Sequence, residues 1–115
     1  MEVEPLKYWI VKPASSSQGR GIYLANSFSQ IQDKHEMIVS TYISNPLTIN
    51  GLKFDLRLYV VVTCLHPLRI YIYEDGLVRF ATELYQSPEV DQNQFAHLTN
   101  YSINKASAKF VQTGS

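Results

Sequence analysis

The segment over residues 54–64 constrains the fold of this chain more than any other feature of its sequence, because its side chains alternate clearly at first. Positions 54, 56, 58 and 60 face one way and positions 55, 57, 59 and 61 the other, which is the period of a β-strand. The His66-Pro67 pair predicts a turn, and residues 69–73 predict a second strand. Glu74-Asp75-Gly76 has the composition of a hairpin turn, followed by a third strand over residues 77–81. We therefore expect a three-stranded antiparallel meander.

The flanking segments predict further short strands and one short helix. Aromatic and β-branched residues indicate strands over residues 7–12, 22–24 and 37–43, and a polar, glycine-bearing loop lies between the first two. Ser27 with Gln30 fits a capping box and predicts a helix to about Gln32 or Asp33. Residues 83–94 are typical of a loop, and residues 97–102 show no clean period. The fold class is therefore α+β, mainly antiparallel sheet, with the helices that should cover the sheet missing from the inventory.

Composition excludes several classes of protein. Ten Lys and Arg balance ten Asp and Glu among 115 residues, so the chain lacks the basic field of a duplex DNA binder. A hydrophobic content of 45% is too high for a disordered segment. One cysteine, Cys64, excludes a disulfide framework and indicates a reducing compartment. The acidic N-terminus does not match a signal peptide, and no apolar run is long enough for a membrane span. We expect a soluble intracellular domain or a piece of one.

Lys12 is the first candidate for chemistry, because it ends a strand directly before the loop that carries Gly19-Arg20-Gly21. Such a loop can bring backbone N–H groups close to phosphate oxygens, while the lysine supplies a positive charge. A hairpin turn with a solvated Arg20 explains the same residues about equally well.

The charged face of the strand over residues 54–64 is the second candidate. Asp55 and Arg57 lie on one face of an otherwise apolar strand, and buried charges need partners. One interpretation is an Asp55–Arg57 pair on a solvated face. The other is a basic wall around a polyanion such as a triphosphate, in which Asp55 orients one member; its cations are Lys12, Lys53 and Arg79. The histidines show no metal-ligand spacing, and His97 is expected to hydrogen-bond locally and shape its loop.

Six blocks of sequence occur in one order that resembles a known family. They are Trp9-Ile10-Val11-Lys12-Pro13, Gln18-Gly19-Arg20-Gly21-Ile22, Lys53-Phe54-Asp55-Leu56-Arg57-Leu58-Tyr59-Val60, Pro67-Leu68-Arg69-Ile70-Tyr71, Gly76-Leu77-Val78-Arg79-Phe80-Ala81 and His97-Leu98-Thr99-Asn100-Tyr101-Ser102-Ile103-Asn104-Lys105. The chain resembles the tubulin–tyrosine ligase-like proteins, ATP-grasp ligases that attach amino acids to tubulin, and most of all their glutamate-adding branch. The resemblance covers nearly the whole chain, from about Tyr8 to Lys105.

The resemblance implies roles for individual residues. It implies that Lys12 contacts the ATP phosphates and that the flexible loop with Gln18, Gly19, Arg20 and Gly21 covers them. It implies that the linker Ser40, Thr41, Tyr42 and Ile43 hydrogen-bonds the adenine through its backbone, and that Lys53, Phe54 and Asp55 hold the base and ribose side. Thr99 and Asn100 would be a further contact to the nucleotide. It implies that Arg79 holds the carboxylate of the incoming glutamate, with Tyr101 and Ser102 as further contacts. Arg79 and Arg57 are the expected catalytic residues.

The resemblance also sets expectations for the whole protein. Residues 1–115 would be the central segment of an ATP-grasp catalytic domain, truncated at both ends, with the Mg²⁺ ligands beyond the last block and none within the chain. The intact protein would join free glutamate to glutamate side chains of tubulin tails through an acyl-phosphate, and this chain alone would be inactive. Its partners would be tubulin and microtubules, with no nucleic acid and no membrane. Its location would be the cytoplasm and the cytoskeleton, including the cilium or basal body.

Other functions fit parts of the same sequence. The segment could be a non-catalytic module that binds nucleotide or tubulin tails, or belong to a family member that adds glycine or tyrosine. A sheet that stacks single-stranded RNA on Tyr23, Tyr71 and Tyr73, beside Arg20 and Arg69, is disfavoured by the zero net charge.

Overall fold

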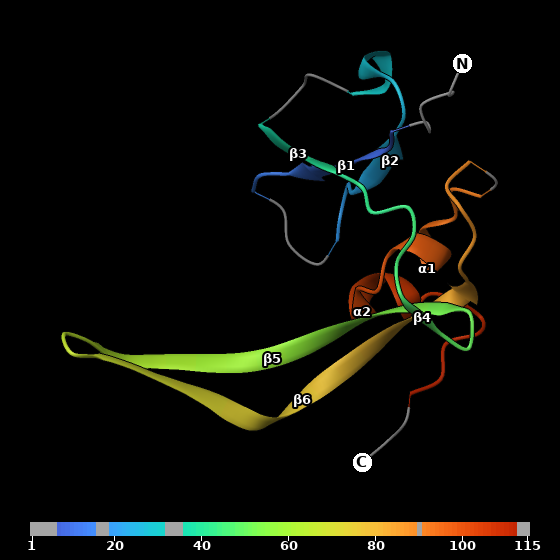
Figure 1. Ribbon diagram of the computed structural model, residues 1–115. Helices are drawn as coiled ribbons and strands as arrows, with labels where there is room; N and C mark the ends of the chain where they lie inside the picture. The colour runs from blue at the N-terminus through green and yellow to red at the C-terminus, as the bar shows by residue number, and fades with distance from the viewer. Residues whose placement is uncertain (1–6, 16–18, 32–35, 90, 113–115) are drawn as a thin grey trace, which may run out of the picture.

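The structure is a computed structural model that describes residues 7–15, 19–31, 36–89 and 91–112. Its described part contains two antiparallel sheets of three strands each, ordered β2-β1-β3 and β4-β5-β6. Two short helices, α1 (Gln94–His97) and α2 (Tyr101–Asn104), lie between the first sheet and the second (Figure 1). The chain is therefore α+β and mainly antiparallel, as the sequence predicts.

The first sheet is built on β1 (Trp9–Pro13), with β2 (Tyr23–Ala25) on one side and β3 (Met37–Thr41) on the other. All three predicted strands are confirmed, within one or two residues at most ends. The predicted helix after Ser27 is a single 3₁₀ turn, η1 (Phe28–Gln30). The side chain of Gln30 accepts a hydrogen bond from the backbone N–H of Asn26 at 2.8 Å, whereas Ser27 makes no side-chain cap. Gln32 and Asp33 lie outside the described residues.

The second sheet is dominated by one long hairpin, β5 (Leu52–Leu65) and β6 (Leu68–Leu84), with β4 (Thr48–Ile49) paired to the start of β5. The predicted three-stranded meander is wrong, because Glu74-Asp75-Gly76 is not a turn. Leu58 pairs with Gly76 and Val60 pairs with Ile72, so Tyr59 alone lies opposite residues 73–75. The three residues form a β-bulge within β6, which absorbs extra residues in one strand without reversing it.

A second irregularity lies at the base of the hairpin. Leu52 pairs with Leu84 and Phe54 with Phe80, so Lys53 lies opposite residues 81–83. A bulge locally increases twist and redirects side chains. Here it leaves Thr82 facing α2, where its backbone N–H donates to the side-chain oxygen of Asn104 at 3.0 Å.

The core lies where the first sheet, the base of the hairpin and the two short helices meet. Its apolar members are aliphatic or aromatic, and two polar side chains are buried with them; they are Tyr8, Val11, Ala25, Tyr42, Ala81, Ala96, Leu98, His97 and Asn104. Asn93 and Asn100 are the N-cap residues of the two helices, and the Asn93 side chain accepts from the N–H of Phe95 at 3.0 Å. The sequence reasoning missed both helices, since four residues are too few to show a helical period.

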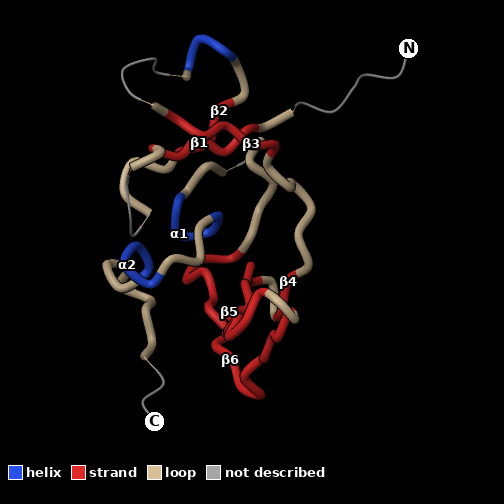
Figure 2. The backbone as a smooth tube through the Cα atoms, turned by 90° about the vertical axis from the view of Figure 1, so that its left-hand side faces the viewer, coloured by secondary structure: helices blue, strands red, loops and turns tan. Residues whose placement is uncertain are grey.

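The rest of the hairpin projects away from this core. Residues 56–78 of β5, β6 and their connection are here called the distal arm. The distal arm extends to one side, away from the other elements (Figure 1), and points toward the viewer in Figure 2. The radius of gyration is 17.1 Å, against about 13 Å for a compact domain of this length. The accessible surface is 9182 Å², against about 6,400 Å² for a compact protein of this mass. No helix among the described residues is long and apolar enough to cross a membrane.

Candidate functional site

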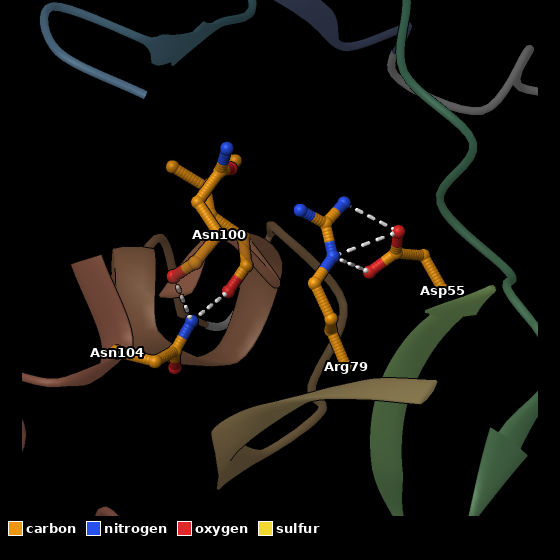
Figure 3. A network of polar contacts seen from close by, with 5 residues as sticks. Asp55, Arg79, Asn100 and Asn104 are labelled. Atoms are coloured by element: carbon orange, nitrogen blue, oxygen red, sulfur yellow. Dashed lines mark hydrogen bonds and ion pairs between the residues drawn. The ribbon is translucent and has the colours of Figure 1, made fainter. Parts of the chain in front are cut away.

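A cross-strand ion pair marks the base of the hairpin. Asp55 on β5 and Arg79 on β6 lie directly opposite each other in the register. Arg79 Nε donates to Asp55 Oδ1 at 3.0 Å and to Oδ2 at 3.1 Å, and Nη2 donates to Oδ2 at 2.5 Å (Figure 3). The planar guanidinium therefore binds the carboxylate along one edge, a geometry that lysine cannot copy. The hydrogen bonds that the structure gives Arg79 among the described residues all use this edge.

The protonation of this pair follows from its contacts. Burial alone would raise the pKa of the Asp55 carboxyl, but hydrogen bonds from Arg79 and Thr99 and the charges of Arg79 and Arg57 hold that pKa below its ordinary value. The hydrogen bond to Asp55 raises the pKa of Arg79 in turn. Asp55 therefore pairs with Arg79 rather than with Arg57, which pairs in register with Leu77. Asp55 thus contacts Arg79, one of the three cations named in the second interpretation. The polyanion that this interpretation places among those cations stays a prediction.

A second cation, Lys53, lies beside this pair and is half-buried. Its ammonium donates to the hydroxyl of Tyr42 at 3.2 Å and to the backbone carbonyl of His97 at 2.9 Å. It also lies 4.6 Å from the centre of the Tyr42 ring. Burial lowers the pKa of Lys53, Asp55 opposes that shift and the positive charge of Lys12 adds to it. Lys12 on β1 and Lys53 on β5 thus act on each other across the two sheets.

Asn104 fixes the segment that follows α1. Its Nδ2 donates to the carbonyls of Leu98 at 2.7 Å and of Asn100 at 3.0 Å (Figure 3). Its Oδ1 accepts from the N–H and the hydroxyl of Thr82 at 3.0 and 2.9 Å. One buried amide therefore ties residues 98–100 to β6. This places Thr99 where it hydrogen-bonds Asp55.

The glycine loop lies against the same segment. Gly19 and Gly21 have φ of +75° and +72°, in the left-handed region that favours glycine. A Cβ on Gly19 would lie 2.6 Å from Ile103 Cδ1 and 3.1 Å from Asn100 Cγ. The loop after β1 therefore needs glycine both for its backbone and for its close approach to α2.

The structure brings together part of the site expected from the resemblance. Lys53, Asp55, Arg79, Thr99 and Asn100 gather at the base of the hairpin, with Gly19 touching Asn100. Phe54 faces the opposite side of β5, where its ring contacts Phe80 with centroids 6.0 Å apart.

The other expected residues lie around this cluster. Ser40, Thr41 and Ile43 are exposed at the end of β3 and in the linker after it, whereas Tyr42 between them is buried. The remaining expected residues are exposed or half-buried: Lys12, Arg20, Gly21, Arg57, Tyr101 and Ser102. Gln18 lies outside the described residues.

Sequence reasoning underrated His97 and did not single out Asn104. Both side chains are almost wholly buried and hydrogen-bonded. The signal available in the sequence was that both polar residues lie in one of the six blocks that carry the family resemblance, His97 to Lys105. The described residues contain no cluster of His, Cys, Asp or Glu able to hold a metal ion.

Comparison with known proteins decides the family. The family model described as "Tubulin-tyrosine ligase family" matches residues 1–114. The chain belongs to the tubulin-tyrosine ligase family. The resemblance drawn from the six sequence blocks is confirmed.

Individual relatives of this family member are tubulin polyglutamylases. The chain is 57% identical over 104 residues to human tubulin polyglutamylase TTLL5, which covers 90% of this chain and 8% of that protein. It is 51% identical over 108 residues to mouse tubulin polyglutamylase TTLL6, covering 92% of this chain and 13% of that protein. It is 52% identical over 103 residues to human probable tubulin polyglutamylase TTLL2, covering 90% and 17%. The chain thus spans less than a fifth of the length of these relatives.

Proposed function

We propose that residues 1–115 are the central, nucleotide- and glutamate-binding segment of the catalytic domain of a tubulin–glutamate ligase. The observation that carries the proposal is the juxtaposition, at the base of the hairpin, of an Asp55-held guanidinium with a half-buried ammonium. Two proteins named tubulin polyglutamylases with over 50% identity to this chain support the choice of glutamate. The large exposed apolar surface of the distal arm supports a segment that is covered in a larger domain.

In this proposal ATP is bound between the two sheets. Lys12 and Lys53 neutralise phosphate oxygens. Burial lowers the pKa of Lys53 and the charge of Lys12 lowers it further, and this repulsion between the two lysines falls when a polyanion binds. The loop at Gly19–Gly21 covers the phosphates, and the linker at residues 40–43 bonds the adenine through its backbone. Phe54 and Asp55 line the base and ribose side, and Thr99 and Asn100 complete the contacts.

Glutamate is bound by the free edge of Arg79. Asp55 occupies Nε and one N–H of Nη2, so the remaining N–H groups point to a second carboxylate. Tyr101 and Ser102 add contacts to the amino acid, and Arg57 adds positive charge at the same edge of β5.

The proposed reaction needs no nucleophile from the protein. A tubulin glutamate carboxylate attacks the γ-phosphorus of ATP, giving an acyl-phosphate and ADP. The amine of free glutamate then attacks the acyl carbon, phosphate leaves, and an amide bond forms. The residues of this chain contribute positioning and charge neutralisation.

Mg²⁺ does not fit the part of the chain that the structure describes, because no cluster of carboxylates is present there. We propose that its ligands lie in another part of the intact protein, and that ligation requires that part. We propose that the intact protein acts on microtubules in the cytoplasm, including those of the cilium or basal body.

Calorimetric titration of the 115-residue chain with ATP, with and without Mg²⁺, tests the nucleotide part. Saturable binding that Lys12→Ala weakens at least tenfold is expected, because a phosphate–lysine contact is a charge-assisted hydrogen bond. Lys109→Ala is the matched control, since Lys109 pairs with Glu83 instead. A folded chain that does not bind ATP would contradict the proposal that these residues suffice for nucleotide binding. The alternative that would then remain is a segment that binds tubulin without nucleotide.

Ligation of glutamate to a tubulin tail peptide, by a longer protein that carries this segment, tests the substrate part. Arg79→Lys should raise the glutamate concentration needed for half-maximal rate and leave that for ATP unchanged. An equal effect on both substrates would remove Arg79 from the glutamate site. Faster incorporation of glycine or tyrosine than of glutamate would reassign the amino acid.

A further inference from the structure

The contacts of Lys53 form one end of a chain of hydrogen bonds that the proposed reaction does not use. The Tyr42 hydroxyl, which accepts from Lys53, lies 2.7 Å from His97 Nδ1. His97 Nε2 lies 2.5 Å from the backbone carbonyl oxygen of Asp91. The three side chains come from β5, from the linker after β3 and from α1, so the chain of contacts joins three separate elements.

The donor and acceptor of each hydrogen bond in this series follow from its last member, the backbone carbonyl of Asp91. A carbonyl oxygen can only accept, so His97 Nε2 carries the proton. The neutral ring then presents a lone pair at Nδ1, which accepts the Tyr42 O–H. The hydroxyl oxygen is thereby turned so that its lone pairs face the Lys53 ammonium. Because that ammonium has three N–H groups and uses two on Tyr42 and His97, one is left to point at a ligand.

The surroundings of His97 favour its neutral form. Burial lowers its pKa, the positive charge of Lys53 lowers it further, and the contact with Asp91 opposes both. Tyr42 and Tyr85 both contact the ring edge to face, with centroids 5.6 and 5.3 Å away. Burial also raises the pKa of the Tyr42 hydroxyl, so the hydroxyl keeps its proton.

We propose that Tyr42 and His97 are positioning residues that hold the Lys53 ammonium in the orientation required by an anionic ligand. Neither touches the ligand through its side chain; each acts through the next atom in the chain of contacts. This inference rests on the proposed function for the identity of the ligand, ATP, but the orientation of Lys53 can be measured without it.

Nuclear magnetic resonance of lysine side chains, labelled with ¹³C at Cε and ¹⁵N at Nζ, tests the orientation in the 115-residue chain. Tyr42→Phe, which removes only the hydroxyl, should move the Lys53 signals toward those of an exposed lysine. His97→Gln should do the same, because its amide does not reach the Nδ1 position. His97→Asn, whose Oδ1 can occupy that position, should restore much of the native signal. Tyr71→Phe, on the exposed distal arm, should change nothing.

Lowering the pH distinguishes a role of His97 in positioning Lys53 from a role in packing alone. Protonated His97 cannot accept from Tyr42 and places a second positive charge near Lys53. The wild-type Lys53 signal should therefore move below pH 6.5, the ordinary pKa of histidine, toward its position in Tyr42→Phe. The His97→Asn chain should lack this step. A Lys53 signal that is unmoved in Tyr42→Phe, or the same step in both chains, would overturn the proposal.

Titration with ATP gives the consequence for binding. Tyr42→Phe and His97→Gln should weaken ATP about tenfold, the effect of losing one hydrogen bond to a charged group. Ala25→Gly, which removes a buried methyl from β2, should lower stability and leave ATP affinity unchanged. Displaced Lys53 signals with unchanged ATP affinity, in a chain where Lys53→Ala weakens ATP, would overturn the role in binding. If the wild-type chain does not bind ATP, the nucleotide proposal fails and the lysine signals still decide the orientation of Lys53.

Discussion

The base and the distal arm of the same β5–β6 hairpin differ in what surrounds them. At the base, Asp55 is paired with Arg79, Lys53 with Tyr42 and His97, and Thr82 with Asn104. Along the arm, Val60, Ile72 and most of their neighbours are more than half exposed. Both parts have the same strand period and the same backbone ladder, so the ladder alone does not decide where the site lies.

The difference teaches that long-range polar contacts, rather than strand pairing, turn the base of the hairpin into a site. The side chains of Asp55, Lys53 and Asn104 each bond a group from another element, and those bonds are made in a partly buried setting where they are strong. The arm makes no such contact among the described residues, and its exposed apolar side chains are of the kind that a protein surface covers.

Breaking the Asn104 contacts should have the largest effect on the base. Asn104→Ala removes four hydrogen bonds and leaves buried groups of Thr82 and Leu98 without partners. A loss of about 3 kcal/mol in the free energy of unfolding is expected, measured by urea denaturation. Asn45→Ala, at an exposed loop position, is the control and should change little. A small effect for Asn104→Ala would mean that the segment is held by packing instead.

Removing the ion pair should have a smaller effect. Both side chains of the Arg79–Asp55 pair are about a third exposed, so Arg79→Ala should cost about 1 kcal/mol near pH 7. The pKa of Asp55 is lowered in the folded state, so this stabilisation is present above its ordinary pKa of 3.8 and is lost as the pH falls below it. The urea curves of wild type and variant should therefore converge in acid. Lys109→Ala, which breaks a more exposed pair, should lie nearer wild type.

The pH dependence of folding sharpens the comparison at His97. Its pKa is lowered in the folded state, so the unfolded chain binds the proton first and stability falls as the pH drops below 6.5. The slope should be at most about 1.4 kcal/mol per pH unit for one proton. His97→Gln should flatten this part of the profile, as measured by thermal melts between pH 7 and pH 5. An unchanged slope would assign the effect to other groups.

Giving the arm a charge pair should have the smallest effect. Val60 and Ile72 are directly opposite in the register, so Val60→Asp with Ile72→Arg copies the pair at the base in an exposed setting. The free energy of unfolding should change by less than about 0.5 kcal/mol, while solubility rises because apolar surface is removed. A gain in the free energy of unfolding as large as the loss in Arg79→Ala would show that the burial of an ion pair matters less than the pair itself.

Local patterns predicted most of the strands and missed what depends on distant residues. Alternation at the start of residues 54–64 predicted β5, and the charges on one face of it indicated that Asp55 needs a cation as partner. Which cation it is, Arg57 or one of Lys12, Lys53 and Arg79, depends on the register with β6. Glu74-Asp75-Gly76 has turn composition, but the ladder continues past it because Leu58 and Val60 both find partners on β6. The two four-residue helices have no period to detect, and the burial of His97 and Asn104 depends on elements up to 55 positions away in the chain.

The saturated amide of Asn104 also has a consequence for hydrogen exchange. Each of its Nδ2 protons is committed to a different carbonyl, and the side chain is 1% exposed. Solvent can reach these protons only when the Asn104 side chain separates from the carbonyls of residues 98 and 100, so their exchange rate measures that opening. Two resolved side-chain signals would thus report, in a single spectrum, how often α2 releases the segment that carries Thr99 and Asn100.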